Sequence, residues 1–195
     1  MRSLSVFCGS SRGRQPVYLH AVGELARVLA SDGIRLVYGG NSTGTMGALA
    51  DGVLEAGGQV VGVIPEYDFG QGWAHEGLTE LHVVDSMHER KARMAELSDG
   101  FIALPGGLGT LDEFAEAITW LQLGLHQKPT GLLNTAGYYE ALLRFFDHAV
   151  AERFLREEDR ALILAETEVR PLLDLMRAWT PRQDQGWVPA DGPAA

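Results

Sequence analysis

The sequence has few of the residues from which disulfides, metal sites and lysine-dependent active sites are built. Cys8 is the only cysteine, so an internal disulfide and a cysteine-built metal centre are both excluded. The six histidines do not show the spacing of an H-E-x-x-H metal motif, and we expect no metal. Lysine occurs only as Lys91 and Lys128, beside 14 arginines. Any chemistry that needs a lysine amine therefore has two candidates.

Long apolar runs and net positive charge are missing as well. No stretch of 18 apolar residues occurs, and the N-terminus lacks the apolar core of a signal peptide. We therefore expect a cytoplasmic protein without a membrane partner. The net charge of −10 argues against nonspecific binding to nucleic acid or to anionic membranes. A local pocket for a phosphate group is compatible with this charge.

Glycine, in contrast, is abundant, with 24 residues, and much of it follows apolar strand-like segments. These segments alternate with helical patterns, which predicts an α/β domain over residues 1–180. Its fold would be a Rossmann-like, doubly wound parallel sheet with helices on both faces. Residues 181–195 are expected to form a mobile tail. The expected strands are 4–8, 34–38, 60–64, 81–84, 101–104, 130–133 and 162–165; the segment 66–77 is expected to be a loop over the site.

Three of the expected strands run directly into glycine-rich turns that precede helices. In such a sheet, ligands bind beyond the carboxyl ends of the strands. A glycine turn at a helix N-terminus also directs free N–H groups and the positive end of the helix dipole at one point. These junctions predict one phosphate-binding crevice, provided that their strands are near neighbours. The candidate residues are Gly9, Ser10, Gly40, Gly44, Gly106, Gly107, Gly109 and Thr110.

Glu113 has two interpretations. Thr110 could be the N-cap of the helix that follows, with Glu113 three residues later completing a capping box. Alternatively, Glu113 is a carboxylate held beside a bound phosphate ester for chemistry. The spacing alone favours the capping box, and the two interpretations do not exclude each other.

Arg90 interrupts the apolar stripe of the helix expected over residues 86–97. It lies three residues after Met87 and four before Met94, where the pattern calls for an apolar side chain. A charge at such a position needs a partner or a ligand. The alternatives are a structural salt bridge or a long side chain that reaches past the edge of the core, and they apply still more to Lys91.

Two motifs together resemble one known family. Met87-His-Glu-Arg-Lys91, followed by Pro105-Gly-Gly-Leu-Gly-Thr-Leu-Asp-Glu113, is similar to the signatures of the LONELY GUY family of cytokinin riboside 5'-monophosphate phosphoribohydrolases. The resemblance covers roughly residues 3 to 165. It implies a catalytic pair, a phosphate-binding loop and further ligand-lining positions, with no cofactor. The residues at these positions are Arg90 and Glu113; Gly106, Gly107, Gly109 and Thr110; and Lys91 and Thr119.

The implied reaction is hydrolysis of the N-glycosidic bond of an N6-substituted adenine riboside 5'-monophosphate, giving the free base and ribose 5-phosphate. A nucleosidase that prefers plain AMP and a non-enzymatic carrier of a nucleotide or pterin cofactor are the alternatives. Many relatives are labelled lysine decarboxylase, but pyridoxal chemistry needs a Schiff-base lysine. Glu76 is a weak candidate for the base pocket. The apolar residues Trp120, Leu121 and Leu125, with the resemblance, suggest a homodimer.

Overall fold

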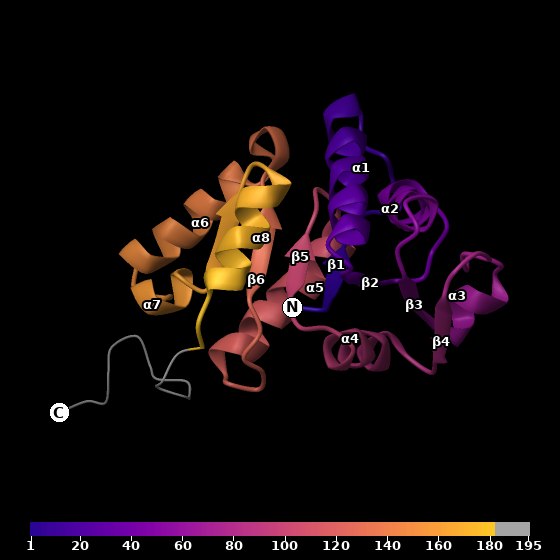
Figure 1. The fold of residues 1–195 in the computed structure, drawn as a ribbon. Helices are drawn as coiled ribbons and strands as arrows, with labels where there is room; N and C mark the ends of the chain where they lie inside the picture. The colour runs from indigo at the N-terminus through magenta and orange to yellow at the C-terminus, as the bar shows by residue number, and fades with distance from the viewer. Residues whose placement is uncertain (182–195) are drawn as a thin grey trace.

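The computed structural model describes residues 1–181, and its centre is a seven-stranded sheet (Figure 1). All six strand pairings are parallel, and the strand order is β4-β3-β2-β1-β5-β6-β7. The predicted Rossmann-like parallel α/β fold is confirmed. The strands are β1 Ser3–Phe7, β2 Arg35–Tyr38, β3 Val60–Pro65, β4 Glu80–Val84, β5 Phe101–Ala103, β6 Thr130–Leu133 and β7 Ile163–Glu166.

Helices cover both faces of the sheet, as expected. One hydrophobic cluster joins one face to α1, α2 and α8, and a second cluster joins the other face to α4, α5 and α6. Figure 1 shows α1 and α2 on one side of the strands and α4 on the other. The helices are α1 Pro16–Ser31, α2 Gly44–Glu55, α3 Glu66–Gly70, α4 Met87–Glu96, α5 Leu108–Gln122, the 3-10 turn η1 Thr135–Gly137, α6 Glu140–Ala151, α7 Glu157–Arg160 and α8 Val169–Ala178.

The winding of the chain locates the site. From β1 the chain adds β2, β3 and β4 on one side; it then returns to place β5, β6 and β7 on the other. The switch point therefore lies between β1 and β5, where a parallel sheet opens a crevice beyond its carboxyl ends. The strands β2, β1 and β5 are consecutive in the sheet. The strands that carry the three glycine-rich turns are therefore near neighbours, as one common crevice requires.

Several local predictions need correction. The segment 66–77 is not a plain loop, because it contains α3 and a bridge from Ala74 to Asn41. Met87 is exposed rather than part of a buried stripe, and Leu121 is buried rather than exposed. The expected tail falls almost wholly on residues 182–195, outside the described residues. No helix within residues 1–181 has the length and apolar character needed to cross a membrane.

Candidate functional site

The turns after β1 and β2 are joined by Thr45, in the first turn of α2. The Thr45 hydroxyl donates to the Gly9 carbonyl oxygen at 2.9 Å and accepts the Gly9 N–H at 2.9 Å. Gly44 packs so closely that a Cβ there would lie 2.1 Å from the Ser10 carbonyl carbon. Sequence reasoning missed Thr45, whose only signal was its place in the glycine-rich loop 39–47. The substrate contacts predicted for Gly9, Ser10 and Gly44 remain predictions.

Gly40 belongs to the same edge of the sheet but contacts the segment 66–77. Its carbonyl oxygen accepts the N–H of His75 at 2.9 Å, and its φ of +75° is in the left-handed region that favours glycine. Glu76, the weak base-pocket candidate, follows His75 and is exposed. The structure therefore attaches the segment 66–77 to the loop after β2.

The turn after β5 presents unpaired donors at the start of α5. Gly107 is the N-cap, and the first intrahelical bond runs from the Leu111 N–H to the Gly107 carbonyl oxygen at 3.1 Å. The N–H groups before Leu111 consequently lack an acceptor within the helix. Thr110 is buried, and its hydroxyl has no hydrogen-bond partner among residues 1–181. An anion placed here would satisfy these donors and meet the positive end of the helix dipole.

The capping-box interpretation of Glu113 is wrong. The helix begins at Leu108, so Thr110 lies inside its first turn and is not the N-cap. The Glu113 carboxylate instead accepts a hydrogen bond from the Arg90 guanidinium, across from α4. Both side chains are largely buried, with exposed fractions of 12% for Arg90 and 6% for Glu113. The partner that the charge at Arg90 required is therefore Glu113.

The surroundings of this pair perturb its chemistry. Burial raises the pKa of the Glu113 carboxyl, while the positive charge of Arg90 opposes that rise. The Arg90 Nε is buried without a hydrogen-bond partner in the described part of the chain. A Cβ at Gly39 would lie 3.4 Å from Arg90 Nη1, so this glycine, which sequence reasoning also missed, borders the guanidinium. The pair thus joins α4 to α5 beside the loop after β2.

The side chains of Lys91 and Thr119 bond to residues of α5 and not to the glycine-rich turns. Lys91 Nζ bonds Asp112 Oδ2 at 3.0 Å and Glu116 Oε2 at 3.1 Å, on the seam between α4 and α5. Burial acts to lower the pKa of Lys91, but these two carboxylates outweigh it and raise the pKa. Thr119 is exposed, and its hydroxyl donates to the Ala115 carbonyl oxygen at 2.7 Å. A ligand-lining role for Lys91 or Thr119 remains a prediction, and the contacts that they make within this chain do not account for it.

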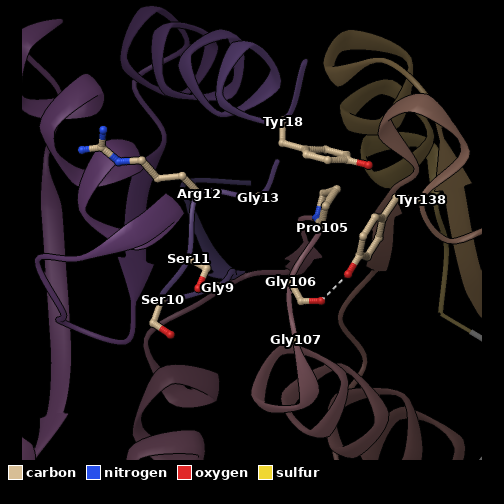
Figure 2. Close-up of a pocket in the computed structure, with 10 residues that line it drawn as sticks. All are labelled: Gly9, Ser10, Ser11, Arg12, Gly13, Tyr18, Pro105, Gly106, Gly107 and Tyr138. Atoms are coloured by element: carbon tan, nitrogen blue, oxygen red, sulfur yellow. Dashed lines mark hydrogen bonds between the residues drawn. The ribbon is translucent and has the colours of Figure 1, made fainter. Parts of the chain in front are cut away.

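A cavity of about 270 Å³ adjoins the turns after β1 and β5. Its far wall is formed by two tyrosines, Tyr18 and Tyr138, whose rings meet edge to face with centroids 5.6 Å apart. Figure 2 shows the Tyr18 ring above Pro105 and the Tyr138 ring beside it, with the Arg12 side chain turned away from both rings. Neither tyrosine was expected from the sequence. The lining residues are Gly9, Ser10, Ser11, Arg12, Gly13, Tyr18, Pro105, Gly106, Gly107 and Tyr138.

Lys128, the other lysine, lies at the opposite edge of the sheet. It precedes β6, and its Nζ donates to the Ala95 carbonyl oxygen at 2.6 Å near the end of α4. Burial lowers the pKa of Lys128. The crevice at the carboxyl ends of the strands is therefore out of its reach.

Comparison with known proteins shows the family. The model of a family described as "possible lysine decarboxylase" matches residues 46–176. The chain is 45% identical over 187 residues to the cytokinin riboside 5'-monophosphate phosphoribohydrolase LOG of Oryza sativa subsp. japonica, covering 96% of this chain and 77% of that protein. It is 47% identical over 178 residues to the cytokinin riboside 5'-monophosphate phosphoribohydrolase of Rhodococcoides fascians, covering 91% and 90%.

A solved structure shares the fold at lower identity. The Moco carrier protein of Chlamydomonas reinhardtii superposes with a TM-score of 0.68 at 24% identity, covering 90% of this chain and 95% of that one. This likeness speaks for the fold alone. The long, even matches to the curated phosphoribohydrolases, with both motifs in place, show that the chain belongs to the LONELY GUY family.

Proposed function

We propose that this chain hydrolyses the N-glycosidic bond of cytokinin riboside 5'-monophosphates, releasing the free base and ribose 5-phosphate. The observation that carries the proposal is the buried Arg90–Glu113 pair, held beside a helix N-terminus with unpaired donors. The names of the relatives supply the substrate class. The preference for an N6-substituted over a plain adenine belongs to this proposal.

The 5'-phosphate binds at the start of α5. The free N–H groups of its first turn and the unpaired Thr110 hydroxyl are donors suited to phosphate oxygens. Fixing the phosphate there holds the ribose near Glu113, one helical turn further along α5. Binding energy from the phosphate is thereby used to orient the reacting carbon.

Glu113 then acts on the charge that develops at C1'. As the bond from C1' to the base nitrogen breaks, the sugar gains oxocarbenium character, as in glycoside cleavage. A preformed carboxylate in a buried site stabilises that cation and orients the attacking water. The water oxygen bonds to C1', the bonding electrons leave with the base nitrogen, and one proton of the water is transferred to the base. Arg90 holds the Glu113 carboxylate in place and offsets charge on the departing base.

Lysine decarboxylation, suggested by the description of the matching family model, does not fit these residues. Pyridoxal chemistry needs a lysine amine free to form a Schiff base. Lys91 is held by two carboxylates that favour its protonated form, and Lys128 lies at the other end of the sheet. No step is derived through such a cofactor.

The chain is proposed to form a homodimer through the α5–α6 side of the sheet. Helix α6 is amphipathic, yet none of its residues is fully buried in one chain. Large apolar side chains are also exposed at the end of α5 and after α6, and Leu125 and Phe154 are exposed by 69% and 89%. Light scattering at micromolar concentration should give about twice 21.2 kDa. Leu125→Asp should shift that mass to one chain, whereas Leu175→Asp on the opposite face should not.

The function is tested by incubating the pure protein with N6-isopentenyl-AMP, AMP and N6-isopentenyladenosine and following base release. We expect release of free base and ribose 5-phosphate from the nucleotide, and at least about 100-fold slower release from the riboside, since the riboside lacks the group that positions the sugar. Equal rates with and without the phosphate would contradict the assigned phosphate site. Binding of the nucleotide without base release would favour a carrier.

A further inference from the structure

The turn that carries Gly106 and Gly107 accepts hydrogen bonds from two consecutive tyrosines. The Tyr138 hydroxyl donates to the Gly106 carbonyl oxygen at 2.6 Å, a bond that Figure 2 shows. The Tyr139 hydroxyl donates to the Leu104 carbonyl oxygen at 2.5 Å. The two carbonyl groups lie on either side of Pro105. We call Tyr138 and Tyr139 the tyrosine clamp.

The tyrosine clamp is positioned by the turn after β6, which is itself fixed by hydrogen bonds. The side-chain oxygen of Asn134 accepts the Tyr139 N–H at 2.7 Å, and the Asn134 N–H donates to the Glu166 carbonyl oxygen at 2.7 Å. Ala136 adopts φ +53°, a left-handed conformation that is unfavourable for a residue with a Cβ. Such a conformation persists where the surroundings over-determine it. Because β6 pairs with β5, the turn lies next to the loop that it holds.

The two tyrosines hold the loop differently. Tyr139 is buried, and burial raises the pKa of its hydroxyl, which therefore stays protonated as a donor. Tyr138 is 44% exposed and lines the cavity beside the loop. Tyr139 thus belongs to the core at the base of the turn, whereas Tyr138 touches the part of the turn that is open to a ligand.

A hydrogen bond to the Gly106 carbonyl oxygen has a consequence one atom further along the backbone. The peptide group is planar and trans, so fixing this C=O also fixes the N–H of Gly107, which points the opposite way. Between two glycines such a peptide would otherwise reorient easily, because neither residue has a Cβ to restrict it. Gly107 is the N-cap of α5, and a Cβ added to it would contact nothing else in residues 1–181 within 4 Å.

We propose that Tyr138 is a positioning residue for the phosphate-binding loop, whose hydroxyl holds the Gly106–Gly107 peptide so that the Gly107 N–H faces the 5'-phosphate. The inference rests on the proposed function for the identity of the ligand. The chemistry itself requires only a phosphate monoester. Removing the hydroxyl leaves the ring, the cavity wall and the buried Tyr139 in place, and frees only the peptide.

The test is Tyr138→Phe, with Tyr18→Phe as the matched control. Tyr18 packs against the Tyr138 ring and lines the same cavity, but the Tyr18 hydroxyl makes no hydrogen bond among residues 1–181. Calorimetry gives Kd for ribose 5-phosphate, kinetics give KM and kcat for N6-isopentenyl-AMP, and melting gives stability. For Tyr138→Phe we expect Kd and KM to rise about 10-fold, the scale of one hydrogen bond. We expect the kcat and the melting temperature of Tyr138→Phe to be unchanged. Tyr18→Phe should behave like the wild type in all of these measurements.

Two results would overturn the inference. An unchanged Kd in Tyr138→Phe, with or without a fall in kcat, would show that the hydroxyl does not order the loop for phosphate binding. An equal loss of affinity in Tyr18→Phe would show that general packing in the cavity, and not the Tyr138 hydroxyl, orders the loop. Should the wild type bind ribose 5-phosphate but release no base, the proposed function fails. The Kd comparison still decides the role of Tyr138 in that case.

Discussion

The loops after β2 and β5 are both rich in glycine, but they use it for different purposes. In the loop after β2, the protein itself occupies the space where side chains would be. A Cβ on Gly44 would lie 2.1 Å from the Ser10 carbonyl carbon, and one on Gly47 would lie 2.0 Å from the Ser42 carbonyl oxygen. Where the loop after β5 enters α5, a Cβ on Gly107 or Gly109 would meet no other part of residues 1–181 within 4 Å, adjoining backbone aside.

The difference separates glycines required for folding from glycines that leave room for a ligand. Close backbone approach explains the loop after β2 without any substrate. At Gly107 and Gly109, no close contact within residues 1–181 explains the glycine. An anion bound at the helix N-terminus would explain it, because the anion needs that open space. Gly106 belongs to the first kind, because a Cβ there would lie 2.2 Å from the Thr110 hydroxyl oxygen. A glycine-rich motif therefore mixes both roles.

The largest effect is expected from Gly44→Ala. The added methyl group would collide with backbone, and the φ of +65° is unfavourable for alanine. We expect a loss of about 3 kcal/mol in the free energy of unfolding, at the upper end of overpacking effects. Gly57→Ala is the control, since Gly57 has a φ of +78° but a Cβ there would contact nothing within 4 Å in the described part of the chain. Urea unfolding gives the loss of free energy for each variant, and the difference between the two losses measures the contact with Ser10. Equal losses would show that this contact contributes nothing.

Gly109→Ala should have the opposite pattern. Gly109 lies in the first turn of α5 without a positive φ, so alanine should raise the free energy of unfolding by about 0.5 kcal/mol through helix propensity. The methyl group would occupy the space assigned to the phosphate, and we expect about 10-fold weaker binding of N6-isopentenyl-AMP, roughly the loss of one hydrogen bond. Unfolding and calorimetry measure the two effects. Unchanged affinity would remove Gly109 from the phosphate site.

A smaller effect should appear in the pH dependence. Burial raises the pKa of Glu113 above 4.5, the ordinary value for glutamate, so its carboxylate is lost at a higher pH than usual on acidification. We expect kcat at saturating nucleotide to fall through a pKa above 4.5. In that range the folded state binds the proton more tightly than the unfolded state, so protonating Glu113 does not destabilise the fold. Circular dichroism at each pH should show intact structure, and a flat kcat down to pH 4.5 would contradict the prediction.

Much of the architecture could be predicted from the sequence, because parallel strands buried on both faces read as apolar runs that alternate with amphipathic helices. The partner of Arg90 could not be read from local spacing. Thr110 and Glu113 have the spacing of a capping box, but α5 begins earlier, at Leu108, so the local rule was applied to the wrong residue.

Contacts between loops were harder still to predict. Thr45 binds the Gly9 backbone and Tyr138 binds the Gly106 backbone, and each pair comes from segments more than 30 positions apart in sequence. A tyrosine or threonine hydroxyl carries no sequence signal for a distant backbone carbonyl. These contacts follow from the strand order, which brings the turns after β2, β1, β5 and β6 side by side.

The central claim is that Glu113 serves the chemistry at the loop after β5, and Glu113→Gln tests it most directly. Glutamine keeps the shape and can still accept the hydrogen bond from Arg90, but it removes the negative charge. We predict a folded protein that binds N6-isopentenyl-AMP, with base release slowed by at least about 100-fold, the usual loss for one preorganised electrostatic group. Base release close to that of the wild type, with the same binding and melting temperature, would contradict the account and reduce Glu113 to a structural partner of Arg90.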